Sequence, residues 1–223
     1  MNRSGSKIYV IGLLGLLLSI FMGYYLLNKE EVRLPIYNPA DLNKRLVDSS
    51  LQKVKRSHKV GAFKLIDQEG IQITEENFKD KIYVTDFFFT TCPTICPKMT
   101  KQMKRVQDEF MDDDVIKFIS HSVTPEIDSV ETLQTYAVNN GAIPGKWHLV
   151  TGSKQMIYEL ARKSYFAVTT EGDGGENDFI HTENFVLVDK EKRLRGFYDG
   201  TSIEDVDRLI DDIYLLKKEY EIN

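Results

Sequence analysis

The two cysteines of this 223-residue chain, Cys92 and Cys96, stand four residues apart. They follow residues 82–89, a β-branched and aromatic run that predicts a buried strand. They precede residues 99–111, where apolar side chains recur at helical spacing. Two thiols at a strand-to-helix junction can exchange disulfides, bind a soft metal or close a structural disulfide. Ligands gather at the carboxyl ends of strands in open α/β sheets, so the pair marks the candidate site.

The residues beside the cysteines favour a functional role. Pro97 suits the first turn of a helix, since its missing N–H would have no partner there. We expect Cys96 to lie in or near that turn, where the positive end of the helix dipole would lower its thiol pKa. A low pKa would favour metal binding or disulfide exchange. The alternatives are a plain structural disulfide and two thiols packed as small hydrophobic groups.

The chain has four histidines, and their positions predict different roles. His58 falls in a predicted linker, where we expect it to be solvated. His121 and His148 fall within predicted strands and are expected to be structural. His181 lies between an acidic, glycine-rich segment, 171–178, and a predicted strand. From spacing alone, a single histidine at such a junction is more often a surface residue than a metal ligand.

Strands and helices alternate along most of the chain. The expected strands are 63–66, 71–73, 82–89, 115–123, 147–150, 184–188 and 193–198, and the expected helices are 99–111, 128–139, 153–164 and 202–220. The order predicts an α/β fold with a mixed sheet flanked by helices, beginning with a β-hairpin. Residues 62–223 are long enough for one core and too short for two.

The N-terminal region predicts a membrane anchor followed by a linker. Residues 8–27 carry no charge, and a helix of that length covers ~30 Å, the thickness of the hydrocarbon layer. The run exceeds the ~7–15 apolar residues of a cleaved signal peptide, so we expect one transmembrane helix. Basic residues within 1–7 place that end in the cytoplasm and the domain on the extracytoplasmic, periplasmic side. No cysteine lies nearby to be lipidated. Residues 28–61 read as a polar linker with a short helical piece from Asp41.

The charge balance argues against one class of partner. The chain has 29 basic and 34 acidic residues, a formal net charge of −5, and no basic stripe. Such a surface is a poor match for nucleic acid, because the phosphate backbone requires clustered positive charge. We therefore expect no nucleic-acid partner.

Three segments, in this order, resemble the Sco (Sco/SenC) family of copper proteins: Phe88-Phe89-Thr-Thr-Cys92-Pro-Thr-Ile-Cys96-Pro, Ser122-Val-Thr-Pro-Glu-Ile-Asp128 and Phe179-Ile-His181-Thr. The resemblance runs from about residue 62 to the C-terminus and includes the placement of the anchor. It implies a thioredoxin-like fold with an extra hairpin. It also implies one copper ion bound by Cys92, Cys96 and His181, and a role in assembling the dicopper centre of cytochrome c oxidase.

The resemblance also implies partners for this chain, and the chain departs from the family pattern at two positions. The implied partners are the copper-bearing oxidase subunit and an upstream copper donor or thiol reductant. The family usually has Asp where this chain has Thr124, and often has Asp directly before the histidine, where this chain has Ile180. Neither position is one of the three implied ligands. A mobile 171–178 segment would let the histidine ligand arrive and leave.

The ligand chemistry agrees with copper, while other activities stay open. Two thiolates and one imidazole suit Cu(I), and also Cu(II) with an added oxygen ligand, whereas structural zinc prefers four protein ligands. The main alternative is a thiol-disulfide oxidoreductase that keeps the oxidase cysteines reduced. Ordinary thioredoxin-like reductases have two residues between their cysteines and a proline before a later strand. Here three residues intervene and no proline follows Pro144, which favours metal delivery over an enzyme. No convincing set of residues for a peroxidase is present.

Overall fold

The computed structural model describes residues 3–27, 33–42, 47, 53, 55, 58–168, 175 and 178–222. The chain divides into two compact units, Met1–Arg33 and Leu34–Asn223. The first unit contains helix α1 (Arg3–Leu27), which includes the expected anchor. Among the described residues, no helix has both the length and the hydropathy that crossing a bilayer requires. The anchor therefore stays a prediction.

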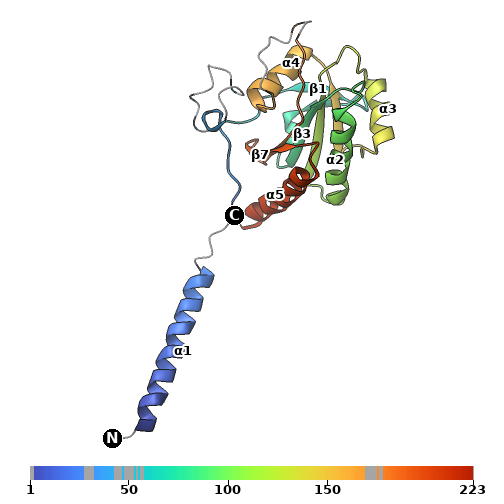
Figure 1. Ribbon diagram of the computed structural model, residues 1–223. Helices are drawn as coiled ribbons and strands as arrows, with labels where there is room; N and C mark the ends of the chain where they lie inside the picture. The colour runs from blue at the N-terminus through green and yellow to red at the C-terminus, as the bar shows by residue number, and fades with distance from the viewer. Residues whose placement is uncertain are drawn as a thin grey trace. The chain divides into compact units, whose positions relative to one another are not determined.

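The second unit is built on a seven-stranded sheet, shown in Figure 1, with strand order β2-β1-β5-β4-β3-β6-β7. The strands are β1 (Lys64–Asp67), β2 (Gln72–Thr74), β3 (Ile82–Phe88), β4 (Ile116–Ser122), β5 (Trp147–Thr151), β6 (Asn184–Val188) and β7 (Leu194–Asp199). Strands β3, β4 and β5 run parallel, and β1, β2, β6 and β7 add antiparallel pairs at the two edges. The expected mixed sheet is confirmed.

Helices cover both faces of this sheet (Figure 1). They are α2 (Ile95–Glu109), α3 (Val130–Asn140), α4 (Lys154–Glu159) and α5 (Ile203–Ile222), with short turns η1 (Pro39–Asp41), η2 (Glu75–Phe78) and the π-helical η3 (Leu160–Ser164). Residues of α2, α3 and α5 share one hydrophobic cluster, whereas α4, η3 and η2 contribute to another. The sheet therefore separates two cores.

Strand β3 explains why the chain needs both helical layers. All seven of its residues are buried. Its side chains alternate between faces, as a pleated strand requires: Tyr83 and Phe87 join one core, and Val84 and Phe88 join the other. A strand covered on both sides reads as a continuous apolar run, which is why the sequence identified it.

Local signals set the ends of several elements. Gly70, in the turn between β1 and β2, has φ 74°, and Gly141 ends α3 at φ 70°, a left-handed backbone that glycine adopts without steric cost. The Ser153 side chain caps α4 by accepting the N–H of Met156. The expected helix over 153–164 differs in its second half, because η3 continues it as a π-helical turn.

The described part of the expected 28–61 linker packs against the domain. Tyr37 forms an isolated bridge with Leu194 of β7, with an N–O distance of 2.9 Å. The Arg195 guanidinium donates to the carbonyl oxygens of Leu34 and Pro35. These contacts fix the start of the second unit on β7. The helical piece expected from Asp41 falls partly on residues 43–46, outside the described residues.

Candidate metal site

The two cysteines lie at the junction between β3 and α2, as the sequence predicted. Cys92 is 6% exposed and Cys96 is 2% exposed, and both thiols are free. Cys96 is the second residue of α2, and its backbone N–H donates to the Cys92 sulfur at 3.5 Å. Pro97 follows in the same first turn. Residues 89–96, here named the cysteine loop, therefore place two sulfurs side by side at a helix N-terminus.

The two thiols differ in acidity. Burial raises the pKa of Cys92, but the N–H groups of Cys96, Thr94 and Ile95 outweigh burial and bring that pKa down to about 7. Burial raises the pKa of Cys96 to about 12, and its thiol contact with Cys92 adds to the rise. The expectation that the helix terminus lowers the pKa of Cys96 is wrong. The N–H groups of the first turn serve the preceding sulfur instead.

A buried carboxylate holds the base of the cysteine loop. Asp128 is fully buried. Its Oδ1 accepts the Thr90 hydroxyl at 2.5 Å, and its Oδ2 accepts the Thr90 N–H at 3.3 Å. Oδ2 also accepts the hydroxyls of Ser122, at 2.5 Å, and of Thr124, at 3.1 Å. Four donors on one buried carboxylate are a strong tie, and Thr90 stands two residues before Cys92. Thr124 contributes a donor where the resembled family usually has Asp.

A second buried acid lies close to the thiols. Asp86, in β3, is 2% exposed, and burial raises its pKa to about 7. Its Oδ1 has no hydrogen-bond partner among the described residues. The charge of Asp86 contributes to the raised pKa of Cys96. Sequence reasoning gave neither acid a role, although Asp128 ends one of the segments that resemble the Sco family, because the sequence of an aspartate does not show whether it will be buried.

His181 lies on an irregular stretch just before β6, residues 178–183, here named the His181 segment. The side chain of His181 is exposed. Its neighbours are not: Ile180 is 1% exposed and Thr182 is 7% exposed. The Thr182 hydroxyl donates to the carbonyl of Ala167 at 2.7 Å. The backbone is thus held on both sides of an open imidazole ring. The question whether 171–178 is mobile falls on residues mostly outside the described ones.

An aromatic contact connects this segment to the cysteine loop. The Phe179 ring meets the Phe89 ring edge to face, with centroids 5.3 Å apart. Within the described part of the chain, however, no three side chains of His, Cys, Asp or Glu gather closely enough to hold a metal ion. The structure therefore brings Cys92 and Cys96 together, and it brings the His181 segment into contact with Phe89, three residues before Cys92. It does not join the imidazole to the two sulfurs in one preformed group.

The other three histidines lie in structural positions. His121 is fully buried in β4, and burial lowers its pKa to about 3. His148 in β5 places Nδ1 3.0 Å from Asp67. Both were expected to be structural. The expectation that His58 is solvated is wrong: it is half-buried, its Nε2 lies 2.8 Å from the Ser164 carbonyl oxygen, and burial lowers its pKa.

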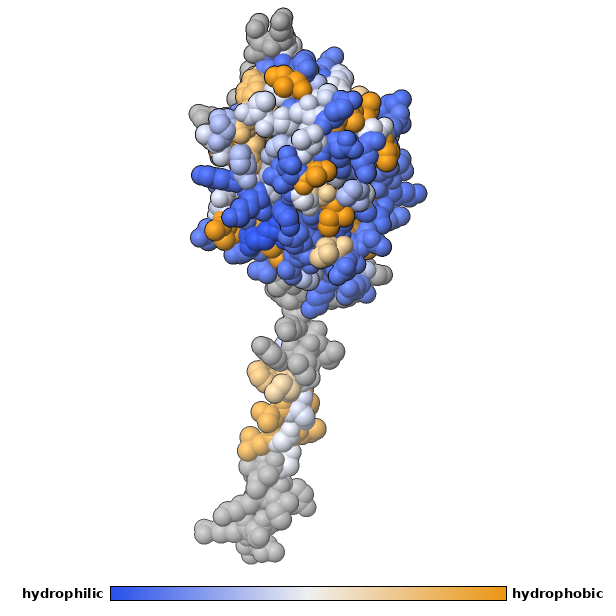
Figure 2. All heavy atoms as spheres, turned by 90° about the vertical axis from the view of Figure 1, so that its right-hand side faces the viewer, coloured by the Kyte–Doolittle hydropathy of each residue, from blue (hydrophilic) through white to orange (hydrophobic). Residues whose placement is uncertain are grey.

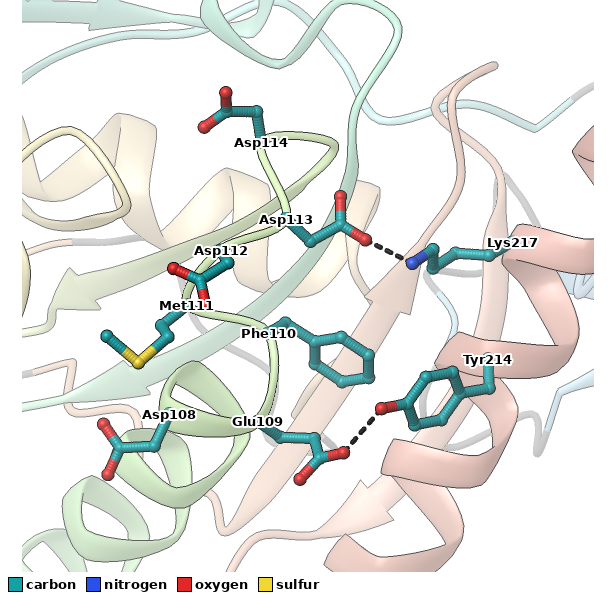
Figure 3. Close-up of a pocket in the computed structure, with 9 residues that line it drawn as sticks. All are labelled: Asp108, Glu109, Phe110, Met111, Asp112, Asp113, Asp114, Tyr214 and Lys217. Carbon is teal, nitrogen blue, oxygen red and sulfur yellow. Dashed lines mark hydrogen bonds and ion pairs between the residues drawn. The ribbon is translucent and has the colours of Figure 1, made fainter.

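A separate acidic pocket lies at the opposite, C-terminal end of α2 (Figure 3). It has a volume of about 440 Å³ and is lined by Asp108, Glu109, Phe110, Met111, Asp112, Asp113, Asp114, Tyr214 and Lys217. Lys217 pairs with Asp113, and the Tyr214 hydroxyl donates to Glu109 at 2.5 Å. Because α5 supplies these partners, we interpret the pocket as a contact between α2 and α5. Figure 2 shows a molecular face on which hydrophobic residues are scattered among hydrophilic ones.

Comparison with known proteins identifies the relatives of this chain. A model described as SCO1/SenC matches residues 52–216. The SCO1 protein homolog of Bacillus subtilis is 32% identical over 159 residues, which is 70% of this chain and 82% of that protein. The structure of BsSco, a member of the Sco family of cytochrome c oxidase assembly proteins with a disulfide switch, is 31% identical. It covers 70% of this chain and 92% of its own, with a TM-score of 0.60.

A further solved relative carries metal. Arabidopsis thaliana ScoI, determined with copper bound, is 28% identical, with a TM-score of 0.57. The match covers 72% of this chain and 98% of ScoI. The likeness to these structures confirms the expected thioredoxin-like mixed sheet with flanking helices.

Proposed function

Because the chain belongs to the SCO1/SenC family, we propose that it binds one copper ion through Cys92, Cys96 and His181 and helps to assemble the dicopper centre of cytochrome c oxidase. Copper is the cargo of such a protein. The copper-bound structure of Arabidopsis ScoI supports the choice of metal. The relative BsSco belongs to a family of cytochrome c oxidase assembly proteins, which supports the proposed role in oxidase assembly. The implied partners are the copper-bearing oxidase subunit and an upstream copper donor or thiol reductant.

The paired free thiols are the observation that carries this proposal. A thiolate, not a thiol, binds metal, and the pKa of about 7 leaves a large share of Cys92 deprotonated at neutral pH. Cu(I) is soft and prefers thiolate ligands. The Cys96 thiol has a pKa of about 12 and is protonated in the metal-free protein. Copper binding then displaces that proton. The loop thus offers one ready ligand and one that metal binding deprotonates.

His181 would supply the third ligand by moving its ring. Its exposed side chain lies on a segment that touches the cysteine loop through Phe179. A protein that delivers a metal needs a ligand set that can open, and an imidazole outside the core meets that need better than a buried one. The two sulfurs would hold Cu(I) alone, and the imidazole would complete the set that Cu(II) prefers.

The N-terminal unit would hold the domain at a membrane. We propose that residues 8–27 form one transmembrane helix, with 1–7 in the cytoplasm and the copper domain on the extracytoplasmic side. The support is a run of twenty residues without a charge, preceded by Arg3 and Lys7. Resistance of the membrane-bound chain to alkaline extraction tests this proposal, and release into the soluble fraction would contradict it.

A copper titration tests the ligand set. The reduced full-length chain in detergent should bind about one copper ion, since it offers one set of two thiolates and one imidazole. Cys92→Ser or Cys96→Ser should abolish tight binding. His181→Ala should keep Cu(I) but lose the imidazole nitrogen signal in the electron paramagnetic resonance (EPR) spectrum of bound Cu(II). His148→Gln, a histidine in β5 outside the site, is the matched control.

Two outcomes would contradict this assignment. Unchanged binding in both cysteine variants would remove the copper function altogether. An unchanged nitrogen signal in His181→Ala would remove His181 from the ligand set. The lowered pKa of Cys92 also suits disulfide exchange. Turnover of a disulfide substrate by the copper-free chain as fast as by a thioredoxin would therefore favour the reductase alternative.

A further inference from the structure

The His181 segment is tied to α4 and η3 by an ion pair and a tyrosine. We propose that Arg162, Asp178 and Tyr158, here named the Asp178 clamp, are positioning residues that set the place from which the His181 imidazole reaches the two cysteines. This inference rests on the proposed copper function. It concerns residues that touch the segment carrying the ligand, not the ligand itself.

The ion pair has the geometry of a strong, directional contact. Arg162 Nη1 lies 2.6 Å from Asp178 Oδ2, and Nη2 lies 2.7 Å from Oδ1. The two side chains are 12% and 8% exposed. A planar guanidinium that meets both carboxylate oxygens fixes orientation as well as distance, which a lysine ammonium does not. Asp178 is three residues before His181, so this contact fixes the approach to the ligand.

Tyr158, one helical turn before Arg162, makes a second contact with the His181 segment. Its side chain is fully buried, and the Arg162 guanidinium lies over its ring, 5.4 Å from the centroid. The Tyr158 hydroxyl lies 3.0 Å from the Val123 carbonyl oxygen and 3.2 Å from that of Asp178. It also accepts the N–H of Ile180 at 3.5 Å. One hydroxyl thus connects the end of β4 with the two ends of the short stretch before His181.

The clamp leaves the imidazole as the free part of the segment. Ile180 is buried on one side of His181, and Thr182 is held by Ala167 on the other. Because the backbone is held on both sides of the ring, copper binding does not have to order this stretch from a free loop. Ordering a free loop costs conformational entropy for every residue fixed. An intact clamp should therefore slow the loss of the imidazole from bound copper.

An uncommon type of helical turn supplies the arginine of the clamp. Arg162 lies within the π-helical turn η3, and such turns are frequent at functional sites.

The test measures copper release and the imidazole signal in the full-length chain. Arg162→Gln and Asp178→Asn should each speed transfer of bound Cu(II) to a chelator about tenfold, a usual effect of removing a group that orients a metal ligand. Each should also weaken the imidazole nitrogen signal of bound Cu(II). Arg162→Lys should fall between wild type and Arg162→Gln. The exchange of the pair, Arg162→Asp with Asp178→Arg, should restore part of the loss.

A matched control separates positioning from stability. Arg195 is another buried arginine, and it pairs with Asp189 at the end of β6 remote from the cysteines. Arg195→Gln should lower the unfolding temperature of the metal-free chain and leave copper release unchanged. If the clamp variants lower only the unfolding temperature, the clamp proposal is overturned and the copper function stands. If His181→Ala itself leaves the nitrogen signal unchanged, the ligand assignment fails first.

Discussion

The cysteine loop and the His181 segment reach the same region by different means. In the loop, the contact that shapes the pair is local: the Cys96 N–H donates to a sulfur four residues back. In the segment, Asp178 meets Arg162 sixteen residues away, and Thr182 meets Ala167 fifteen residues away. One half of the proposed site is therefore built by a helix terminus. The other half is built by tertiary packing.

This difference suits the proposed delivery of a metal. The thiols are buried and already adjacent, so little needs to rearrange when they take copper. The imidazole is exposed and attached to a backbone held on both sides, so it can leave without unfolding its neighbours. A ligand set with one exchangeable member gives a route for transfer to a partner. The comparison becomes testable once each half is perturbed alone.

The largest expected effect is the contrast between the two thiols. A thiolate forms above the pKa of its thiol, so Cys92, with a pKa of about 7, should react at neutral pH, and Cys96, with a pKa of about 12, should stay protonated. In the reduced, metal-free chain at pH 7, we expect iodoacetamide to modify Cys92 at least about a hundredfold faster than it modifies Cys96. Fragmentation mass spectrometry of the singly alkylated chain locates the label.

The pH dependence sharpens the same contrast. The alkylation rate of Cys92 should rise through pH 7 and then level off, while that of Cys96 should still be rising above pH 10. The unmodified chain, carried through the same pH series, controls for unfolding. Faster labelling of Cys96 would mean that the helix terminus acts on the second sulfur, as the sequence alone suggested.

The next effect concerns the stability of the cysteine loop. Asp128→Ala leaves the Thr90 N–H and three hydroxyls without their acceptor, and should lower the free energy of unfolding by about 3 kcal/mol. Asp128→Asn keeps an acceptor oxygen and should cost about 1 kcal/mol. Denaturant unfolding of the metal-free chain measures both.

Asp112 provides the matched control for this loss of a carboxylate. It is exposed at the acidic pocket of Figure 3, and Asp112→Ala should change the free energy of unfolding by less than about 0.5 kcal/mol. Equal effects at Asp112 and Asp128 would show that the four donors add nothing beyond an ordinary surface charge.

The fold was predictable where the signal is local. β3 is a continuous apolar run, Gly70 marks the first hairpin, and Gly141 marks the end of α3. The apolar spacing predicted α2 only from 99, whereas Pro97 already indicated a first turn around Cys96, and α2 in fact begins at Ile95. Buried Cys96 stands three residues before Met99 and continues the same spacing, but a cysteine was not counted as part of an apolar pattern. The π-helical turn η3 was missed, since packing rather than residue type sets its extra residue.

In the candidate site, too, the features set by local sequence could be predicted and those set by tertiary packing could not. The spacing of Cys92 and Cys96 and the strand before them predicted that the two thiols lie together at the start of α2, which the structure confirms. From spacing alone it favoured a surface position for His181, and only family resemblance made that residue a ligand. The roles of Asp128 and Arg162 were invisible, because an aspartate or an arginine reads as solvated until its tertiary partners are known. His58 was misjudged for the same reason.

The smallest expected effect tests the contact that joins the two halves. Phe179 is 48% exposed and touches Phe89 edge to face. Such a pair contributes about 0.5–1.5 kcal/mol, and exposure puts this one at the lower end. Phe179→Ala, Phe89→Leu and the double variant form a mutant cycle whose coupling should be about 0.5 kcal/mol in urea unfolding. Ile127→Ala, an exposed apolar residue of another loop, should show no coupling to Phe89→Leu. A coupling near zero for Phe179 would mean that the two halves merely lie side by side, and that copper itself must draw them together.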